Sequence, residues 1–332
     1  MGVYHFRGRG SRDYSHGVVT VRLLQFIHYS PDMEDDWDRF VAKSRNGTFI
    51  HSRAFMDYHS DRFDDQSALV ISDDEIVGVF PAHAIMSGVA SHNGLTFGGI
   101  VYGMDQRASL VRDMLAGLSD HFATAGFKKI TYKAVPHIFH RYPAEDDLFA
   151  LQSLNAKLIR RDLSAVIPPN GPDKISSLRK RGKKKAQRNN VVIREGDFYE
   201  EFYALLANIL RRHNATPIHS IAELKLLKQR LPERFKLFGA FENDELTAAT
   251  WVFRFDTALH TQYLANSPRG QETGALDFLL FHVLDLAVKD SLYLSFGAST
   301  EQSGSVLNEG LMTQKEGFGA RGLVLDQYEI IL

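Results

Sequence analysis

The chain has 332 residues, of which 44% are hydrophobic and 24% are charged, and this composition is typical of a folded protein with two domains. Lys and Arg number 39 against 40 Asp and Glu, so the net charge of -1 excludes a general attraction to nucleic acid or acidic membranes. The absence of cysteine excludes disulfides, Cys-ligated zinc, iron–sulfur clusters and thiolate nucleophiles.

The N-terminal segment resembles neither a signal peptide nor a membrane anchor. Arg7, Arg9 and Arg12 are not followed by the apolar run that a signal peptide requires. We interpret residues 1–19 as a disordered leader. No run approaches the ~20 apolar residues of a membrane-spanning helix. These features predict a cytoplasmic protein with no membrane span.

The first half is predicted to contain alternating strands and helices. In chain order these are a strand at 21–27, helices at 33–43 and 52–62, strands at 68–72 and 76–82, a helix at 106–125 and a strand at 129–135. The acidic turn Asp73-Asp74-Glu75 between two apolar runs indicates a β-hairpin. A glycine-rich stretch, 93–103, precedes the helix at 106–125.

The second half is predicted to repeat this order. Ser220 and Glu223 form the capping-box pattern of a helix that ends near residue 230. There follow strands at 235–241, 246–255 and 258–265, a loop at 266–273, a helix at 276–287 and a strand at 292–296. An acidic turn again joins the first two of these strands. We interpret the repeat as a duplication, with domains at 20–155 and 156–332 and a proline-rich interruption at 168–172.

The repeated unit resembles GNAT acyltransferases, in which hairpin strands lead into a loop and a helix. In that fold the loop amides and the helix N-terminus hold a pyrophosphate. The segment 269–275 resembles the GNAT motif Gln/Arg-x-x-Gly-x-Gly/Ala through Gln271 and Gly274. Leu276 occupies the last small position, which is a departure from the motif, and the first half has no such motif.

From about residue 20 to its end the chain resembles the FemAB-like group of tandem GNAT proteins. This group includes aminoacyl-tRNA-dependent peptide ligases and N-acyltransferases of polysaccharide loci. The resemblance rests on 91–99 (SHNGLTFGG), on the basic stretch 179–188, and on 296–300 with 315–319. It implies an α/β (α+β) chain of two tandem GNAT-like domains, each a mixed, mostly antiparallel sheet flanked by helices. It also implies acyl-CoA or aminoacyl-tRNA as the donor, with no permanently bound cofactor.

The segment 174–194 is strongly basic. Its cations are Lys174, Arg179, Lys180, Arg181, Lys183, Lys184, Lys185, Arg188 and Arg194, and it contains no acidic residue. Ile175, Leu178, Gly182 and Ala186 recur at helical spacing, which predicts a helix docked along this narrow seam. Because like charges this dense destabilise a helix, we expect a bound polyanion, such as the phosphates of CoA, of a nucleotide sugar or of tRNA. A solvated basic surface is the alternative.

The resemblance assigns several of these residues to donor binding. In Fem-type ligases the similar basic segment borders the donor site, so Arg179, Lys183 and Lys184 are expected to bind the donor together with Gln271 and Gly274. The same resemblance places Lys315 in the donor and acceptor channel, where its charge would stabilise a developing oxyanion.

Further candidates come from residue type and position. His213 and His219 lie in a loop between helices, where a near-neutral imidazole can take a proton from an attacking amine. His92, in the glycine-rich stretch, is a candidate substrate contact. So are Tyr263 and Asn266, at the end of the strand that leads into the loop at 266–273. Ser299 joins this group through the resemblance of 296–300. Simple structural roles are the alternative for each.

These observations predict an N-acyltransferase. It would move an acyl group from acyl-CoA, or from aminoacyl-tRNA, to the amine of a small molecule such as an amino sugar or an amino acid. The sequence contains no zinc-protease, hydrolase-elbow or P-loop motif, and we expect no metal. One alternative is an aminoacyl-tRNA-dependent peptide ligase of the Fem type. Another is a non-catalytic nucleic-acid-binding protein, against which the near-zero net charge and the lack of aromatic residues in the basic segment argue.

Overall fold

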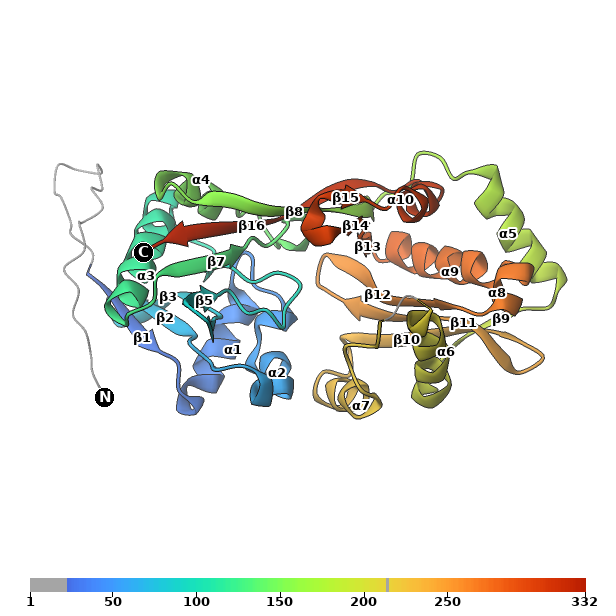
Figure 1. The fold of residues 1–332 in the computed structure, drawn as a ribbon, viewed down its shortest axis with the longest axis horizontal. Coiled ribbons are helices and arrows are strands. Elements are labelled where there is room, and N and C mark those ends of the chain that lie inside the picture. Colours follow the sequence, from blue (N-terminus) through green and yellow to red (C-terminus); the bar gives the residue numbers. More distant parts are fainter. Residues whose placement is uncertain (1–22, 213–214) are drawn as a thin grey trace. The chain divides into compact units, whose positions relative to one another are not determined.

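A computed structural model describes residues 23–212 and 215–332, which form two compact units (Figure 1). Unit 1 comprises the chain up to Arg161 together with Leu325–Leu332, and unit 2 comprises Asp162–Val324. The predicted leader 1–19 lies outside the described residues. The predicted second domain, 156–332, included the whole C-terminus. Leu325–Leu332 belongs to unit 1 because the last strand, β16 (Arg321–Ile331), pairs antiparallel with β7 (Lys129–Lys133).

Unit 1 contains two groups of strands flanked by helices. Its helices are α1 (Glu34–Lys43), α2 (Arg53–Met56), α3 (Ala108–Thr124) and α4 (Asp146–Ser153), and its other strands are β1 (Leu24–His28), β2 (Ala68–Ser72), β3 (Glu75–Phe80), β4 (His83–Ile85), β5 (Gly88–Ala90) and β6 (Val101–Tyr102). Strands β1, β2, β3 and β6 form an antiparallel sheet in that order. Strands β4, β5, β7 and β16 are neighbours in a second sheet, in which only β5 and β7 are parallel. The predicted hairpin, β2–β3, is confirmed.

Unit 2 contains one mixed sheet. Its helices are α5 (Ser177–Arg188), α6 (Tyr199–Arg211), α7 (Ile221–Arg230), α8 (Pro268–Thr273), α9 (Ala275–Lys289) and α10 (Glu309–Glu316). Its strands are β8 (Lys157–Ile167, which begins in unit 1), β9 (Val192–Glu195), β10 (Phe235–Glu242), β11 (Glu245–Arg254), β12 (Ala258–Asn266) and β13 (Tyr293–Ala298), with the small pair β14 (Thr300–Glu301) and β15 (Val306–Leu307). The order in the sheet is β8-β13-β12-β11-β10-β9, and only β12 and β13 are parallel.

Local sequence explains where several helices begin. The capping box predicted at Ser220 is present, because its side chain accepts the Glu223 N–H while the Glu223 carboxylate accepts the Ser220 N–H. The prediction of a loop at 266–273 is wrong, since this segment forms α8. Ser267 caps that helix by accepting the Gly270 N–H, and Pro268 stands at its first position, where a missing N–H costs nothing.

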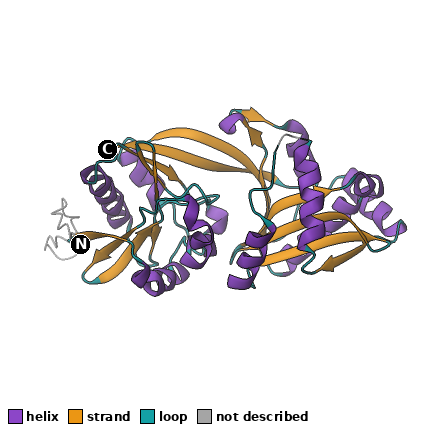
Figure 2. Cartoon of the chain, turned by 60° about the horizontal axis from the view of Figure 1, so that its bottom comes forward, coloured by secondary structure: helices purple, strands orange, loops and turns teal. Residues whose placement is uncertain are grey.

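Each unit has its own hydrophobic core, and helices pack against the strands in both (Figure 2). In unit 1 the apolar face of α3 packs on the strands through Val111, Met114 and Leu118. In unit 2 the helix α9 supplies Leu279, Leu280 and other buried side chains. The predicted mixed, mostly antiparallel sheets flanked by helices are confirmed. None of the helices in the described ranges has the length and apolar character needed to cross a membrane.

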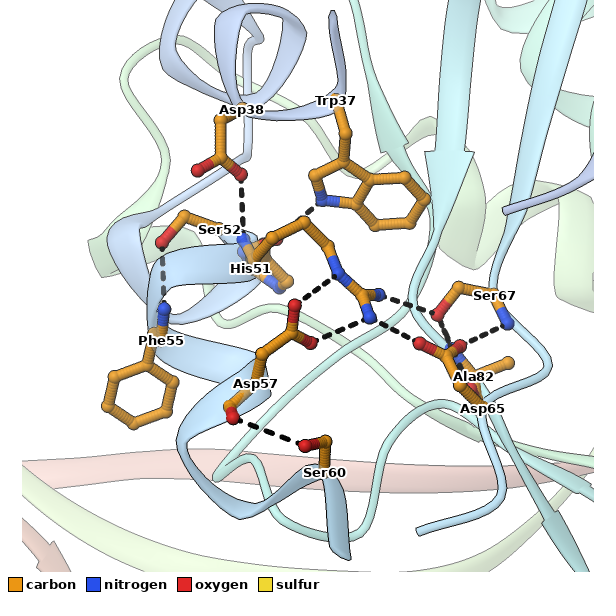
Figure 3. A network of polar contacts seen from close by, with 11 residues as sticks. Trp37, Asp38, His51, Ser52, Phe55, Asp57, Ser60, Asp65, Ser67 and Ala82 are labelled. Atoms are coloured by element: carbon orange, nitrogen blue, oxygen red, sulfur yellow. Dashed lines mark hydrogen bonds and ion pairs between the residues drawn. The ribbon is translucent and has the colours of Figure 1, made fainter. Parts of the chain in front are cut away.

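A buried arginine ties together the α1–α2 region of unit 1 (Figure 3). The side chain of Arg53 is 5% exposed and forms ion pairs with Asp57, at 2.7 Å, and with Asp65. Its guanidinium lies 3.8 Å from the centroid of the Tyr29 ring. The Arg53 backbone N–H donates to Asp38 at 2.7 Å. Arg53 therefore links α2 to α1 through its backbone N–H and to the segment before β2 through its charged side chain, which has little access to water.

Replacing this arginine should destabilise unit 1. We expect Arg53→Gln to lower the free energy of unfolding by about 3 kcal/mol, because two carboxylates lose their buried cation. The chain contains one Trp in each unit, Trp37 and Trp251. In a Trp251→Phe background, fluorescence during urea unfolding therefore reports unit 1 alone.

The matched control is Arg39→Gln, which removes an exposed pair with Asp36 whose side chains are 61% and 60% exposed. Such a pair contributes little, so the change should stay below about 0.5 kcal/mol. Equal effects of the two substitutions would show that the Arg53 network does not stabilise the unit.

Candidate functional site

Strands β12 and β13 separate part of the way along their length. They pair in parallel from Ala258↔Tyr293 to His260↔Ser295. Beyond this point β12 continues to Asn266 against β11, whereas β13 pairs with β8 as far as Ala298. Past this point the facing edges of the two strands no longer hydrogen-bond to each other. Their backbone N–H and C=O groups can therefore bond to other partners.

A cavity of about 660 Å³ opens beside the free length of β12. Its lining residues are Leu264 and Asn266 of β12, Gly270, Gln271, Gly274, Leu276 and Asp277 of α8 and α9, Gly310, Leu311, Thr313 and Gln314 of α10, Arg179 of α5 and Ile209 of α6. We call this the β12 cavity. Its walls combine apolar side chains and glycines with polar and charged side chains that could orient a ligand.

Asn266 is the polar group best placed to bind a substrate in the β12 cavity. Its Oδ1 is buried and has no hydrogen-bond partner among the described residues. A Cβ atom at position 270 would overlap this oxygen, so Gly270 is needed for the close approach. A buried oxygen without a partner is costly unless a ligand supplies a donor. The predicted substrate role of Asn266 remains a prediction, and this geometry favours it.

The basic segment forms the helix α5, as predicted, and packs along α8 and α9 (Figure 1). Ala186 is fully buried, and a Cβ atom on Gly182 would overlap the Asp277 carboxylate. The two backbones are therefore in close contact at Gly182 and Gly274. The prediction that Leu178 lies in this seam is wrong, because its side chain is 54% exposed. The docked face of α5 is built on small residues, which leaves no room there for leucine.

The charges of α5 divide into an inner and an outer set. Arg179 pairs with Asp277 at 2.6 Å, and the Lys183 ammonium lies 4.5 Å from the centroid of the Phe281 ring and 3.9 Å from Asp285. The outer set is exposed and makes no ion pair among the described residues; it comprises Lys180, Arg181, Lys184, Lys185 and Arg188. Of the predicted donor-binding residues, Arg179, Gln271 and Gly274 line the β12 cavity, whereas Lys183 and Lys184 do not.

Asp277 places a carboxylate in the first turn of α9, at the wall of the β12 cavity. Burial raises the pKa of this carboxyl group, and the ion pair with Arg179 opposes that shift. The N-terminus of α9 is therefore already associated with an anion from its own chain. Asp277 was not among the predicted site residues, although acidic residues are common at this position of a helix.

Lys315 is buried in α10, where its side chain is held by the end of β13. Its ammonium donates to the Gly297 carbonyl at 2.8 Å, the Ala298 carbonyl at 2.9 Å and the Ser299 hydroxyl at 2.8 Å. Burial lowers its pKa to about 8. The structure brings the two predicted site residues Lys315 and Ser299 into contact, and we call the three hydrogen bonds of the Lys315 ammonium the Lys315 clamp. Neither residue lines the β12 cavity.

His219 and Tyr263 form a second pair of predicted site residues. His219 Nδ1 lies 2.7 Å from the Tyr263 hydroxyl, and His219 is 5% exposed. The Tyr263 ring contacts Phe202 of α6 and Trp251 of β11, whereas the neighbouring Leu264 packs on the core that contains α9. The pair thus lies on the face of β12 that α6 covers. His213 lies outside the described residues.

His92 belongs to unit 1, whereas the other predicted site residues that are described belong to unit 2. It is buried, and its ring centroid lies 5.3 Å from that of His59 and 5.4 Å from that of His83. Burial, followed by the charges of these two histidines, lowers its pKa to about 2. A neutral imidazole packed among rings fits a core position. Within the described ranges no three His, Asp or Glu side chains are grouped to hold a metal ion.

Comparisons with known proteins define the fold. No protein-family model matches the chain, and no curated protein matches it in sequence. Among solved structures, FemX has a TM-score of 0.66 at 11% identity, with 92% of this chain and 97% of FemX covered. The C-terminal domain of a putative lysylphosphatidylglycerol synthetase from Agrobacterium fabrum has a TM-score of 0.61 at 10% identity, with 90% of this chain and 92% of that domain covered. L-PGS from Bacillus licheniformis has a TM-score of 0.60 at 9% identity, with 90% of this chain and 91% of L-PGS covered.

The similarity extends over nearly the whole length of each of these chains. At such low identity it establishes the fold and leaves the activity to be argued from the site. The chain therefore has the tandem GNAT-like fold of FemX, and the predicted fold class and Fem-type resemblance are confirmed at that level.

The clamp at Lys315 leads to a stability prediction. Lys315→Met keeps most of the apolar stem but leaves two carbonyls and one hydroxyl without their donor, which should cost about 1–3 kcal/mol of unfolding free energy. Trp251 fluorescence in a Trp37→Phe background measures this for unit 2.

The control is Lys184→Met on the exposed face of α5, where a change below about 0.5 kcal/mol is expected. If both substitutions leave the unfolding midpoint unchanged, the Lys315 ammonium is not held by these oxygens. That outcome would instead favour a free, catalytic lysine.

Proposed function

We propose that the protein is a transferase that moves an acyl or aminoacyl group from an activated donor to the amine of a small molecule, such as an amino sugar or an amino acid. The donor would occupy the β12 cavity. The separation of β12 and β13 beside this cavity is the observation that carries the proposal, together with the fold shared with FemX.

A separated strand pair suits a donor with an extended, amide-bearing arm. Such an arm can take up hydrogen bonds that a neighbouring strand would otherwise make, as peptides do when they add to a sheet edge. Asn266 adds a side-chain acceptor at the end of this edge, and Leu264 and Leu276 add apolar surface. The arrangement favours an activated donor that lies along β12.

The proposed reaction is direct transfer. The amine nitrogen forms a bond to the donor carbonyl carbon, the bond to the leaving oxygen or sulfur breaks, and the leaving group gains a proton while the amine loses one. His213 and His219 are the proposed proton acceptors. His219, held by Tyr263, lies on the face of β12 opposite to the side chains of Leu264 and Asn266, so it would reach the amine through the gap between β12 and β13. Lys315 acts on this site by fixing the end of β13. Direct contact of its ammonium with an oxyanion would require release of one of its three acceptors.

The outer cations of α5 favour an aminoacyl-tRNA donor as the second form of this proposal. Five exposed cations without ion pairs lie on one helix beside the β12 cavity, and Arg179 of the same helix lines that cavity. A phosphodiester backbone provides a row of negative charges that matches such a helix. The name of one structural relative, a putative lysylphosphatidylglycerol synthetase, points to the same class of transfer.

Blocking the β12 cavity tests the first proposal. Thr313 is exposed and lines the cavity, so Thr313→Trp should fill it without disturbing the core. We expect deacylation of the donor, measured with acetyl-CoA and with lysyl-tRNA, to fall about a hundredfold for whichever donor is used, because the donor can no longer be positioned.

Glu309→Trp, on the same helix but outside the cavity lining, is the matched control and should keep the wild-type rate. Thermal shifts with each donor give an independent measure of binding. The proposal is wrong if neither donor raises the melting temperature and neither is deacylated faster than in buffer.

The α5 surface is tested by the salt dependence of tRNA binding. The double substitution Lys180→Gln and Lys184→Gln should reduce the slope of log K against log salt by about 1.5, since two phosphate contacts are lost. A Lys225→Gln and Arg230→Gln double variant in α7 carries the same charge change and should leave the slope unaltered.

The outcome also separates the alternatives. A slope that depends on α5 without deacylation of any donor would favour a non-catalytic nucleic-acid-binding protein. If the salt slope of tRNA binding does not depend on α5 and acetyl-CoA is turned over, acyl-CoA is favoured as the donor. The outer cations are then a solvated surface.

A further inference from the structure

A second cavity of about 490 Å³ lies next to the β12 cavity in unit 2. Its lining residues are Leu205, Asn208, Ile209, Arg211 and Arg212 at the end of α6, with Ser267 and Pro268 at the start of α8. Ile209 lines both cavities, and Ser267 follows Asn266 of the β12 cavity directly in sequence. We call it the α6 cavity. The two cavities therefore lie side by side, with Ile209 in the wall of both.

The α6 cavity is positively charged. Arg211 and Arg212 are exposed, and neither side chain makes a hydrogen bond or ion pair with another described residue. None of the described residues that line the cavity is acidic. Asn208 adds an amide, and the Ser267 hydroxyl, which accepts the Gly270 N–H at 2.9 Å, retains its own proton for donation.

The start of α9, by contrast, is crowded and carries a negative charge. Its first-turn amides lack helical acceptors, as at any helix N-terminus, and the amides before them are used within α8, since Gln271 N–H donates to Ser267 O at 2.9 Å and Gly274 N–H donates to Gly270 O at 3.0 Å. Asp277 adds a negative charge at the first turn of α9, and Gly182 of α5 packs against this carboxylate. An incoming phosphate would meet a like charge and a closely packed backbone there.

We propose that the phosphate groups of the donor bind in the α6 cavity, on Arg211 and Arg212, and not on the N-terminus of α9. This inference rests on the proposed function for its assignment of the ligand to the donor. A cavity lined by two arginines and by no acidic residue matches a dianion, such as a phosphate monoester or a pyrophosphate, better than it matches a single carboxylate. Leu205, Ile209 and Pro268 provide apolar contacts for the organic group next to the phosphate.

Inorganic pyrophosphate is a suitable probe, and titration calorimetry of the full chain without divalent cations measures its binding. Arg211→Gln with Arg212→Gln should weaken binding by at least about tenfold, because charge-assisted hydrogen bonds are lost. The control, Lys225→Gln with Arg230→Gln on α7, makes the same change in net charge at exposed positions and should alter affinity less than about twofold. Both sites are exposed, so the fold should tolerate both double variants.

A third variant tests the competing location. Asp277→Asn removes the carboxylate at α9, and under this proposal it leaves pyrophosphate affinity within about twofold of wild type. Four results would overturn the proposal: a large gain in affinity with Asp277→Asn, an equal loss in the α7 control, no loss with the arginine pair replaced, or no binding to the wild type. Pyrophosphate binding that depends on Arg211 and Arg212, without deacylation of any donor, would sustain the phosphate site and sink the proposed transfer.

Discussion

The separation of β12 and β13 is the constraint around which unit 2 is organised. A buried strand that leaves its partner has peptide groups that must find other partners. On the β13 side, the Lys315 ammonium supplies three hydrogen bonds at the strand end, to two carbonyls and one hydroxyl. On the β12 side the edge is left open to the cavity. One strand is fixed by its own chain and the other is free to bind a ligand. The gap is accompanied by register shifts in both flanking pairs, β11–β12 at Trp251/Val252 and β13–β8 between Ser295 and Ala298.

The helix α5 shows how a densely basic segment is made compatible with folding. Its two inward cations, Arg179 and Lys183, face Asp277, Asp285 and the Phe281 ring of α9. Gly182 allows the backbones to approach closely enough for these contacts. Repulsion among the remaining cations is lessened by water on the exposed face, where charges are screened. One face of this short helix thus packs against α9, and the opposite face carries the exposed cations.

Sequence patterns predicted the elements that local chemistry determines. The capping box at Ser220, the acidic hairpin turns and the amphipathic helix α9 depend on neighbours in the chain, and they were found. One error was local, because Ser267 and Pro268 begin α8 where a loop was predicted. The other errors concern contacts between distant segments. Leu178 follows the helical spacing of the seam, yet only small residues fit against α9, and the pairing of β16 with β7 depends on a partner far away in sequence. Asn266 was found because it ends a strand, whereas Thr313 and Gln314 carry no local signal that they would line the cavity.

The return of the last strand to unit 1 makes unit 2 an insertion between Arg161 and Leu325. On the ribosome, all of the inserted unit is translated before β16 emerges, so β7 must wait for its antiparallel neighbour through the synthesis of a whole domain. Non-local pairing of this kind slows folding, and an unpaired strand edge attracts other chains. The short segment Leu325–Leu332 therefore acts as a completion step, after which the nascent N-terminal unit no longer presents that edge to chaperones or to a second copy of the chain.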